Sequence, residues 1–498
     1  MQVLAAPFAL ALALAQTVPL GAVKQLYDTG RWEEVVQLAP PGPDEPAEFD
    51  YYRGMALARL GRLSDARQAL AQGRQKSPRD QRFPLELAGV AFKQNDFRGA
   101  KRELAAALRL DPRNRYALDF LATLYLLDGN LEAALKYWNR IGKPRIENVR
   151  IEPQPRVDPA LLDHAFAFAP ASVLRQGDLA VSQARVDALQ IFPHSSFELT
   201  PRDDDSFDLT FRSTERDGWG GGNKGAGLVS LLGGLPYETV YPGVYNLGGG
   251  ARNFDSLVRW DANKRRVWAA YSAPLGGDAK WRYRLHADAR DENWDLTRTF
   301  YGAGPPLNNL KLERVEAGAD LESVESGRWT WRTGLDLSRR SFDHSPTGGP
   351  PGLTGAAPFF SRGFALKYRA ESRLRVLNAP ERRFTLDATA SAALGKILAS
   401  ASDPFAPLQA GLAGRWLPQS RGDDYETTFR LRGGMTLGQP PFDELFMLGM
   451  ERDNDLWLRG HAGAENGRKG SAPLGRKYLL WTSDVDKTVY SGGFAKLK

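Results

Sequence analysis

From about residue 225 onward, the sequence alternates between apolar and charged residues in successive short segments. The clearest segment sets one series of apolar residues against an interleaved series of charged ones. The apolar series is Phe364, Leu366, Tyr368, Ala370, Leu374 and Val376, and the charged series is Lys367, Arg369, Glu371, Arg373 and Arg375. Because successive side chains of a β-strand point to opposite faces, the pattern predicts strands with one apolar and one charged face.

Two architectures bury one face of such strands. In a soluble sandwich the charged face would lie outside, whereas in a membrane barrel it lines a watery lumen and the apolar face meets lipid. Charged residues make up 25% of the chain and the mean hydropathy is −0.42, but alternating strands cancel in any such average. The 50 glycines and 10% aromatic residues suit turns and interfacial girdles. We predict an antiparallel transmembrane β-barrel over residues 217–498, with roughly twelve strands at about ten residues each.

The extreme N-terminus is apolar from Val3 to Ala15 and ends in Ala13-Leu14-Ala15. This small-x-small ending predicts a secretory signal peptide over residues 1–15, with cleavage before Gln16. The alternative is that the same run forms a buried first helix of the repeats that follow.

Residues 22–143 carry a pattern that recurs every 34 residues. Small residues, turn residues and prolines return in phase. They are Gly54, Ala88 and Ala122; Gly61, Asn95 and Gly129; Ala66, Ala100 and Ala134; and Pro78 and Pro112. The pattern resembles the tetratricopeptide repeat, a pair of helices that cross closely at small residues. The resemblance implies a concave groove that binds a periplasmic protein or peptide, and the alternative is a simple spacer.

Residues 144–216 read as a small α/β domain. Ile146–Glu152 alternates like a strand, Asp158–Phe168 and Asp178–Gln190 read as helices, and Ser195–Thr200 with Ser206–Arg212 reads as a hairpin. This order, placed before a barrel, resembles the polypeptide-transport-associated (POTRA) domain. The resemblance implies a sheet edge that accepts client segments by strand addition.

A motif near the C-terminus carries a more specific resemblance. Pro441–Gly449 leads into Leu458, Arg459, Gly460 and His461, and a Gly-rich stretch and a strand over Tyr478–Asp486 follow. The motif resembles the large loop of outer-membrane assembly barrels and two-partner-secretion transporters. In that superfamily the loop folds into the lumen, where its Arg meets an acidic residue of the wall. The resemblance implies that role for Arg459, and Asp484 and Asp486 are the candidate partners within this chain. The alternative is an ordinary external loop.

Two shorter stretches add to the same resemblance. Tyr245–Gly250 is similar to the segment that opens these barrels, and Phe300–Gly304 is similar to a stretch of the related bacterial surface antigens. Since barrels of this superfamily contain more strands than we predict here, and the chain ends on Lys498, we expect the barrel to be incomplete at its C-terminus.

Several kinds of chemistry find no support in the sequence. The chain has no cysteine, its five histidines do not cluster in sequence, and the common hydrolase, metalloprotease and nucleotide-binding motifs are missing. We therefore expect no enzyme, metal or cofactor. The net charge is +7, but the basic residues are scattered among 59 acidic ones, so we expect no nucleic-acid partner. Inward carboxylates such as Asp336 and Asp387 are expected to pair with neighbouring arginines.

Two functions remain. The first is an outer-membrane assembly or translocation factor whose periplasmic modules bind unfolded outer-membrane or secreted polypeptides. The second is a passive channel or surface antigen with a basic, anion-favouring lumen. The second rests on four cations predicted to face the lumen. These are Arg282, Arg332, Lys367 and Arg373. Both place the barrel in outer-membrane lipid and the N-terminal domains in the periplasm.

Overall fold

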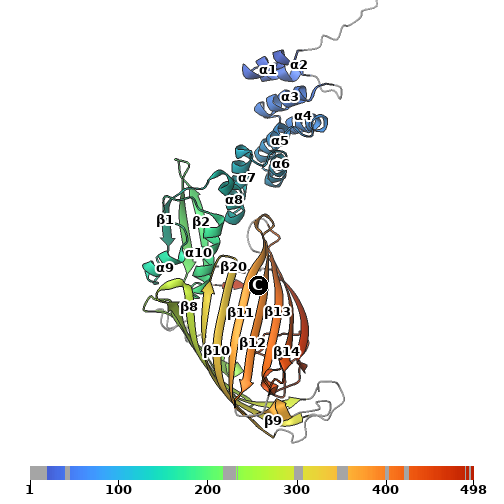
Figure 1. Ribbon diagram of the computed structural model, residues 1–498. Helices are drawn as coiled ribbons and strands as arrows, with labels where there is room; N and C mark the ends of the chain where they lie inside the picture. Colours follow the sequence, from blue (N-terminus) through green and yellow to red (C-terminus); the bar gives the residue numbers. More distant parts are fainter. Residues whose placement is uncertain are drawn as a thin grey trace, which may run out of the picture. The chain divides into compact units, whose positions relative to one another are not determined.

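A computed structural model describes the protein over most of its length (Figure 1). The described residues are 19–39, 45–216, 232, 234–296, 307–344, 357–398, 403–419, 425–487, 490–492 and 495–497. The predicted signal peptide and the stretch at Phe300–Gly304 lie outside them. Contacts divide the chain into two compact units, Met1–Leu127 and Asp128–Lys498. Across the described residues, none of the helices has the length and apolar character needed to span a membrane.

The first unit consists of antiparallel helix pairs, as the 34-residue period predicts. The helices are α1 (Leu20–Asp28), α2 (Trp32–Leu38), α3 (Ala47–Arg59), α4 (Leu63–Lys76), α5 (Arg82–Lys93), α6 (Phe97–Leu110) and α7 (Arg115–Leu127). A Cβ on Gly54 would lie 2.5 Å from Cγ of Leu70, so α3 and α4 approach more closely than alanine would allow. The small residue at this point of the repeat is therefore a packing requirement.

The second unit begins with α8 (Leu131–Trp138) and a small α/β domain. The domain contains β1 (Ile146–Glu152), α9 (Pro159–Ala165), α10 (Gln176–Ala188), β2 (His194–Pro201) and β3 (Phe207–Thr214). Its sheet has the order β1-β3-β2, with β1 parallel and β2 antiparallel to β3. The predicted order of strand, helix, helix, strand and strand is confirmed.

The small domain is fixed to one end of the large sheet. The backbone carbonyl of Leu189, just after α10, accepts hydrogen bonds from Asn253 and Arg282 of the large sheet, at 2.9 and 3.1 Å. The amide of Asp158 donates to the carbonyl of Gly249 at 2.7 Å. Gly249 lies in the glycine turn that the sequence singles out, and its φ of +75° favours glycine. The turn therefore serves as a docking point for α9.

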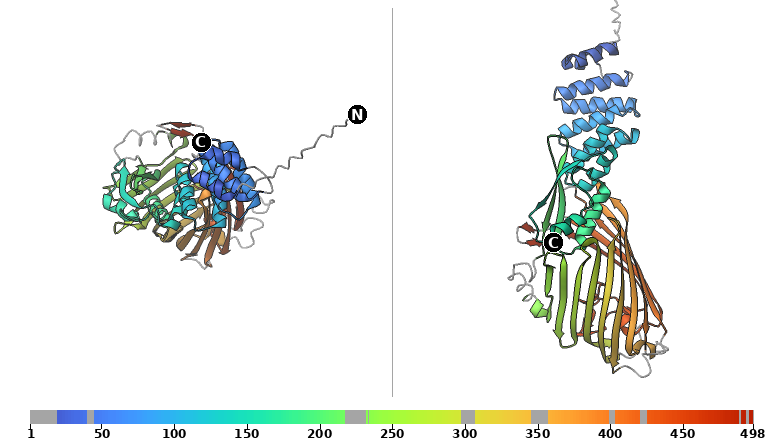
Figure 2. Two further views of the ribbon diagram at one scale, coloured as in Figure 1. Left: turned by 90° about the horizontal axis from the view of Figure 1, so that it is seen from above. Right: turned by 60° about the vertical axis from the view of Figure 1, so that its left-hand side comes forward.

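The rest of the unit is dominated by a 14-stranded sheet (Figures 1 and 2). Its long strands are β6 (Arg252–Asp261), β7 (Lys264–Leu275), β8 (Asp278–Leu296), β9 (Leu307–Val324), β10 (Trp329–Asp343), β11 (Gly363–Ala379), β12 (Phe384–Ile397), β13 (Phe405–Trp416), β14 (Tyr425–Gly438) and β19 (Lys477–Lys487). Neighbours in this order pair antiparallel, and β4 (Thr239–Val240) and β5 (Gly243–Leu247) add to β6. Among the described residues, β4 and β19 stand at the two ends of the strand order. The predicted fold class is confirmed, although roughly twelve strands was too few because short strands were not anticipated.

The two faces of this sheet have opposite chemistry, and the apolar one is exposed. On β10, Leu335 and Leu337 are each 49% exposed, whereas the side chains of the opposite face, Asp336, Ser338 and Arg340, are buried. The other long strands repeat the exposed apolar face. Its members include Val267, Leu285, Val315, Leu366, Tyr368, Leu374, Leu394, Leu412, Trp481 and Val485. A soluble sheet would hide this face, so the arrangement fits a sheet whose outer surface meets lipid.

Candidate functional site

Residues 439–476, here called the inserted segment, connect β14 to β19. The segment contains η5 (Phe442–Glu444), β15 (Phe446–Met447), β16 (Ala464–Glu465), β17 (Arg468–Lys469) and β18 (Leu474–Gly475). It lies against the polar face of the sheet, where β17 pairs with β8 at Lys469 and Trp294. It contacts β19 at one end of the strand order, through Arg459 to Asp484, and β6 next to the other end, through Glu451 to Arg259. The sheet therefore curls around the segment.

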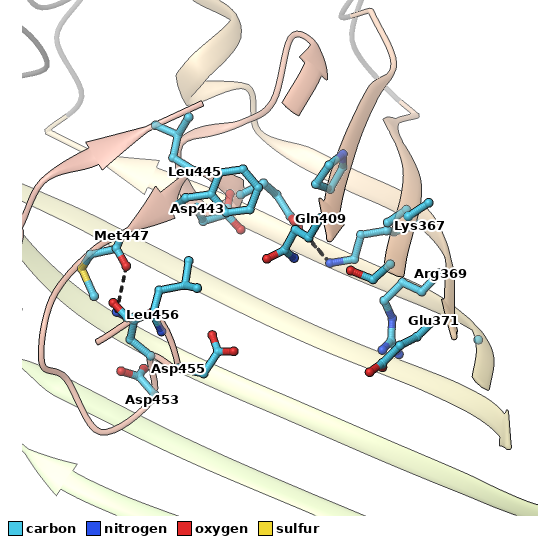
Figure 3. Close-up of a pocket in the computed structure, with 18 of the residues that line it drawn as sticks. Lys367, Arg369, Glu371, Gln409, Asp443, Leu445, Met447, Asp453, Asp455 and Leu456 are labelled. Carbon is cyan, nitrogen blue, oxygen red and sulfur yellow. Dashed lines mark hydrogen bonds and ion pairs between the residues drawn. The ribbon is translucent and has the colours of Figure 1, made fainter. Parts of the chain in front are cut away.

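The first anchor of the segment is an acidic pair at its start (Figure 3). The two carboxylate oxygens of Asp443 accept hydrogen bonds from Arg314 of β9 and Arg340 of β10, each at 3.0 Å. Glu444 accepts from Lys367 of β11 at 3.1 Å. All of these side chains are largely buried, and Arg340 is among the largest fully buried side chains. Three adjacent strands thus hold two successive carboxylates.

The second anchor has the opposite polarity, because here the segment supplies the buried cation. The ammonium group of Lys469 donates to Glu292 of β8 at 2.7 Å and to Asp453 of the segment at 2.5 Å. Asp453 also lies 3.7 Å from Arg266 of β7. A buried charge is tolerated only when it is paired and hydrogen-bonded, so these contacts fix the segment on β7 and β8.

An apolar cluster completes the attachment. Phe442 packs edge-on against Trp294, with ring centroids 5.0 Å apart, and also contacts Phe342. Other members come from both the segment and the wall. They are Leu296, Leu310, Leu312, Met447 and Ala472. At this end of β8, β9 and β10 the inward face therefore becomes apolar, which explains why Phe442 can be buried beside Asp443.

The predicted contact between Arg459 and an acidic wall residue is present, with Asp484 as the partner. Asp486 shares the inward register of Asp484 on β19, but the described residues show no ion pair between it and Arg459. The side chains of Arg459 and Asp484 are 69% and 33% exposed, respectively. An exposed pair of this kind contributes about 0.2–1 kcal/mol, well below the value for a buried pair. Arg459 is thus in the expected place but is not the main anchor.

The other residues of the motif have structural roles. Gly460 has a φ of +80° and open space around it, as a tight turn at the segment tip requires. Leu458 packs at the edge of a cluster formed by Phe446, Leu456 and Leu480. His461 is partly exposed, and its backbone carbonyl accepts from the amide of Met450 at 2.8 Å.

Each of the four predicted lumen cations lies on the polar face and has a partner. Arg282 donates to the carbonyl of Leu189 and to the hydroxyl of Ser272. The remaining three form ion pairs with carboxylates. The pairs are Arg332 with Glu322, Lys367 with Glu444, and Arg373 with Asp387. At these four positions the positive charge or donor groups are therefore shared with protein acceptors.

One carboxylate cluster on the polar face was not apparent from the sequence. His286, Glu316 and Asp336 bring their ligand-type atoms within 4.8 Å of one another. Both oxygens of Asp336 already accept hydrogen bonds from Arg369, at 2.6 and 2.8 Å. The pairing predicted for Asp336 is confirmed. Arg369 supplies the positive charge that keeps Asp336 stable beside Glu316. Asp387 likewise pairs with Arg373 and Arg375.

The strongest anchors were missed because their partners are remote in sequence. Asp443 and Glu444 lie within Pro441–Gly449, which precedes the motif. On β10, Arg340 lies four residues after Asp336 and therefore on the same face of the strand. The alternation of side chains along the strand alone could have placed Arg340 on the polar face. No local signal, however, specifies which part of the segment it meets.

The carboxylates of the inserted segment are held in their charged form. Burial alone would raise the pKa of Glu444, but the charges of Lys367, Arg314 and Arg340 outweigh it and hold this pKa below its ordinary range. Burial opposes ionisation of Asp453 too, and Lys469 in particular lowers its pKa. A carboxyl group whose pKa is lower in the folded state than in the unfolded state stabilises the folded state at any pH above its ordinary pKa. This stabilisation is lost as the pH falls from the ordinary pKa through the lowered one.

We therefore expect the segment to stay anchored at pH 5 and to loosen only well below about pH 4, the ordinary carboxyl range. Limited digestion with pepsin, which is active in acid, should leave residues 439–476 intact at the upper end of its working range. Cutting within the segment should begin only at the most acidic values. Release that is already complete at pH 5 would show that these carboxylates do not hold the segment.

Comparisons with known proteins give two kinds of likeness. Family models described as tetratricopeptide repeat match residues 57–122 and 30–80. Among curated proteins, none matches this sequence. The MamA crystal structure is similar to the helical part, with 18% identity, a TM-score of 0.23, and coverage of 24% of this chain and 72% of MamA.

Three further solved structures are similar over a larger part of the chain. BamA from Haemophilus ducreyi is 11% identical with a TM-score of 0.37, and the match covers 70% of this chain and 69% of that one. CdiB from Escherichia coli is 12% identical with a TM-score of 0.44, covering 71% and 63%. CdiB from Acinetobacter baumannii is 10% identical with a TM-score of 0.40, covering 68% and 60%. The chain thus spans less than two thirds of either CdiB.

Proposed function

We propose that the protein is a non-enzymatic outer-membrane factor that assembles or translocates polypeptides. The single observation that carries the proposal is the inserted segment, held on the polar face of a sheet whose apolar face is exposed. A sheet that only enclosed a pore would not need a long connection fixed against it by buried ion pairs to six strands, β6 to β11.

The location follows from the chemistry of the outer face. Leu335 and Leu337 lie near the middle of β10, while Trp329 lies toward one end and the pair of Arg339 with Phe364 toward the other. Aromatic and basic residues at both ends of an apolar band are typical of the two interfaces of a membrane. We infer an outer-membrane position with the helical repeats and the small α/β domain in the periplasm.

The N-terminal modules suit capture of a client or partner. The helical repeats supply a surface for a peptide or protein. The small domain, interpreted as POTRA-like, leaves β1 and β2 at the edges of its sheet, where an extended segment can add as a further strand. In this proposal a client bound by these modules then passes to the large sheet.

The passive channel is the weaker alternative. It was based on four lumen cations, and each of these is paired with a protein acceptor. The inserted segment also occupies part of the space that a channel would need. A test is depletion of the protein in cells that produce it. We expect surface barrel proteins to fall and periplasmic unfolded forms to rise, whereas loss of solute uptake with normal surface proteins would favour the channel.

Export of the chain gives a separate prediction. We expect cleavage after Ala15, because the apolar run of the N-terminus ends in Ala13-Leu14-Ala15. N-terminal sequencing of protein extracted from outer membranes should begin at Gln16. A protein that retains Met1 and stays in the cytosol would contradict both the signal and the proposed location.

A further inference from the structure

The polar wall beneath the inserted segment carries more hydrogen-bond donors than the segment satisfies. Arg314, Arg340 and Lys367 come from three adjacent strands and converge on Asp443 and Glu444. The Nε atoms of Arg314 and Arg340 are buried, and within the described part of the chain they have no hydrogen-bond partner. Both arginine side chains are more than nine-tenths buried.

The same chemistry extends along the wall. Glu451 of the segment lies 3.5 Å from Lys264 and 3.9 Å from Arg259, and Asp453 lies 3.7 Å from Arg266. Among the described residues, Asp455 of the segment likewise pairs with Arg432 of β14, so five acidic residues of the segment meet cations of the wall. A cavity of about 420 Å³ lies between segment and wall, lined by residues that include Arg290, Lys367, Asp443, Glu444, Asp453 and Lys469. Side chains on both sides of it face one another in Figure 3.

We propose that Arg314, Arg340 and Lys367 form an anion-binding site for an acidic stretch of an unfolded polypeptide. In the resting protein Asp443 and Glu444 occupy this site. This inference rests on the proposed function and adds the chemistry by which a client would displace the segment. Carboxylates are interchangeable as acceptors for guanidinium and ammonium groups, so a client segment with closely spaced acidic residues can replace the segment's own pair. An apolar or basic stretch cannot, because it would not replace the acceptors that Asp443 and Glu444 supply to these buried cations.

The exchange is also energetically reasonable. Moving the segment away from an empty lumen would expose the cations at the cost of their pairing. Moving it while an acidic stretch enters preserves the number of ion pairs, and the free Nε donors of Arg314 and Arg340 can take additional acceptors. The site therefore resists spontaneous opening and responds to one class of ligand.

The experiment uses the full-length protein in lipid vesicles, with spin labels that report the distance between segment and wall. The chain has no cysteine, so Met450→Cys and Leu337→Cys place labels at two exposed positions outside the ion pairs. The probes are a short oligoglutamate peptide, a matched oligolysine peptide and inorganic phosphate. We expect oligoglutamate to lengthen and broaden the distance distribution, and oligolysine to leave it unchanged. If phosphate lengthens the distance as much as oligoglutamate does at an equal concentration of negative charge, the site recognises free anions and the proposal of a polypeptide ligand is wrong.

Variants separate the site from general electrostatics. Arg340→Gln should lower the affinity for fluorescently labelled oligoglutamate about tenfold, as expected for loss of one charge-assisted contact. Binding is measured directly because this substitution also breaks the pair with Asp443 and loosens the segment itself. Arg373→Gln is the matched control, because Arg373 lies on the same polar face but pairs with Asp387. Arg340→Lys keeps the charge and should lie between the two, which guards against a variant that only misfolds.

An unchanged distance in the wild type with oligoglutamate, or equal affinity for oligoglutamate in Arg340→Gln and Arg373→Gln, would overturn the inference. Such a result would not decide the assembly function, which the depletion experiment tests separately. Conversely, surface proteins could stay at normal levels after depletion while oligoglutamate still displaces the segment selectively. That combination would contradict the proposed function and support the anion site.

Discussion

Replacing Asp443 with asparagine is expected to release the inserted segment and abolish most of the activity of the protein. The substitution keeps the shape of the side chain but leaves the buried guanidinium groups of Arg314 and Arg340 without the carboxylate that joins them. Breaking a buried pair on one side costs about 3–5 kcal/mol when the remaining charge is left unpaired. We expect the lower end of this range, because Arg314 and Arg340 each keep a longer contact of 3.5 Å with Glu444. Protease accessibility of residues 450–475 in whole cells measures the release directly.

Arg459→Ala is the matched control for this variant. It removes the motif arginine, but its pair with Asp484 is largely exposed, so the loss should be about 0.2–1 kcal/mol. We therefore expect the segment of Arg459→Ala to be nearly as protected as that of the wild type. Arg459→Lys should differ from the wild type even less, although an ammonium group cannot reproduce the planar fork of a guanidinium. If Arg459→Ala releases the segment and Asp443→Asn does not, the anchors have been ranked in the wrong order.

The second large effect is expected on the outer face of the sheet. Leu335→Arg places a charge in the middle of the exposed apolar band and should reduce folding stability in a bilayer by about 2–4 kcal/mol. Unfolding in urea from lipid vesicles, followed by tryptophan fluorescence, gives the difference.

Ser391→Arg tests whether this loss depends on the face of the sheet. Ser391 lies opposite Glu371 in the pairing of β11 with β12, so an arginine there has a ready partner. We expect a change below about 1 kcal/mol, the range of ordinary surface substitutions. Equal destabilisation by both substitutions would contradict the assignment of the apolar face to lipid.

Much of the fold could be predicted because its signals are local and periodic. The strand at Ile146–Glu152 has its predicted bounds, and the inward and outward faces of the large sheet follow from alternation alone. The first helix of the small domain ends at Ala165, earlier than the predicted Phe168. Phe166 has an extended backbone and packs with Phe197 and Phe211, so tertiary packing ends the helix where the sequence pattern would continue it.

The candidate site could be predicted only in part. The motif placed Arg459 opposite an acidic residue of the last long strand, and the structure shows Asp484 there. It could not rank that contact against the one between Asp443 and Arg340. Ranking requires burial, and burial depends on the register of β9, β10 and β11 relative to a segment about a hundred residues further along the chain. The partners of the four predicted lumen cations could not be predicted for the same reason, since they lie on other strands, in the inserted segment or in the small domain.

The most direct test of the account is the rate at which an unfolded outer-membrane barrel protein folds into vesicles. The vesicles contain the wild-type protein, the Asp443→Asn variant or no protein, and folding is followed by the heat-dependent gel mobility of the client. The account predicts faster folding with the wild type than with empty vesicles, and loss of most of that gain with Asp443→Asn. Client folding at the same rate in wild-type and empty vesicles, with the wild-type protein itself correctly folded, would contradict it.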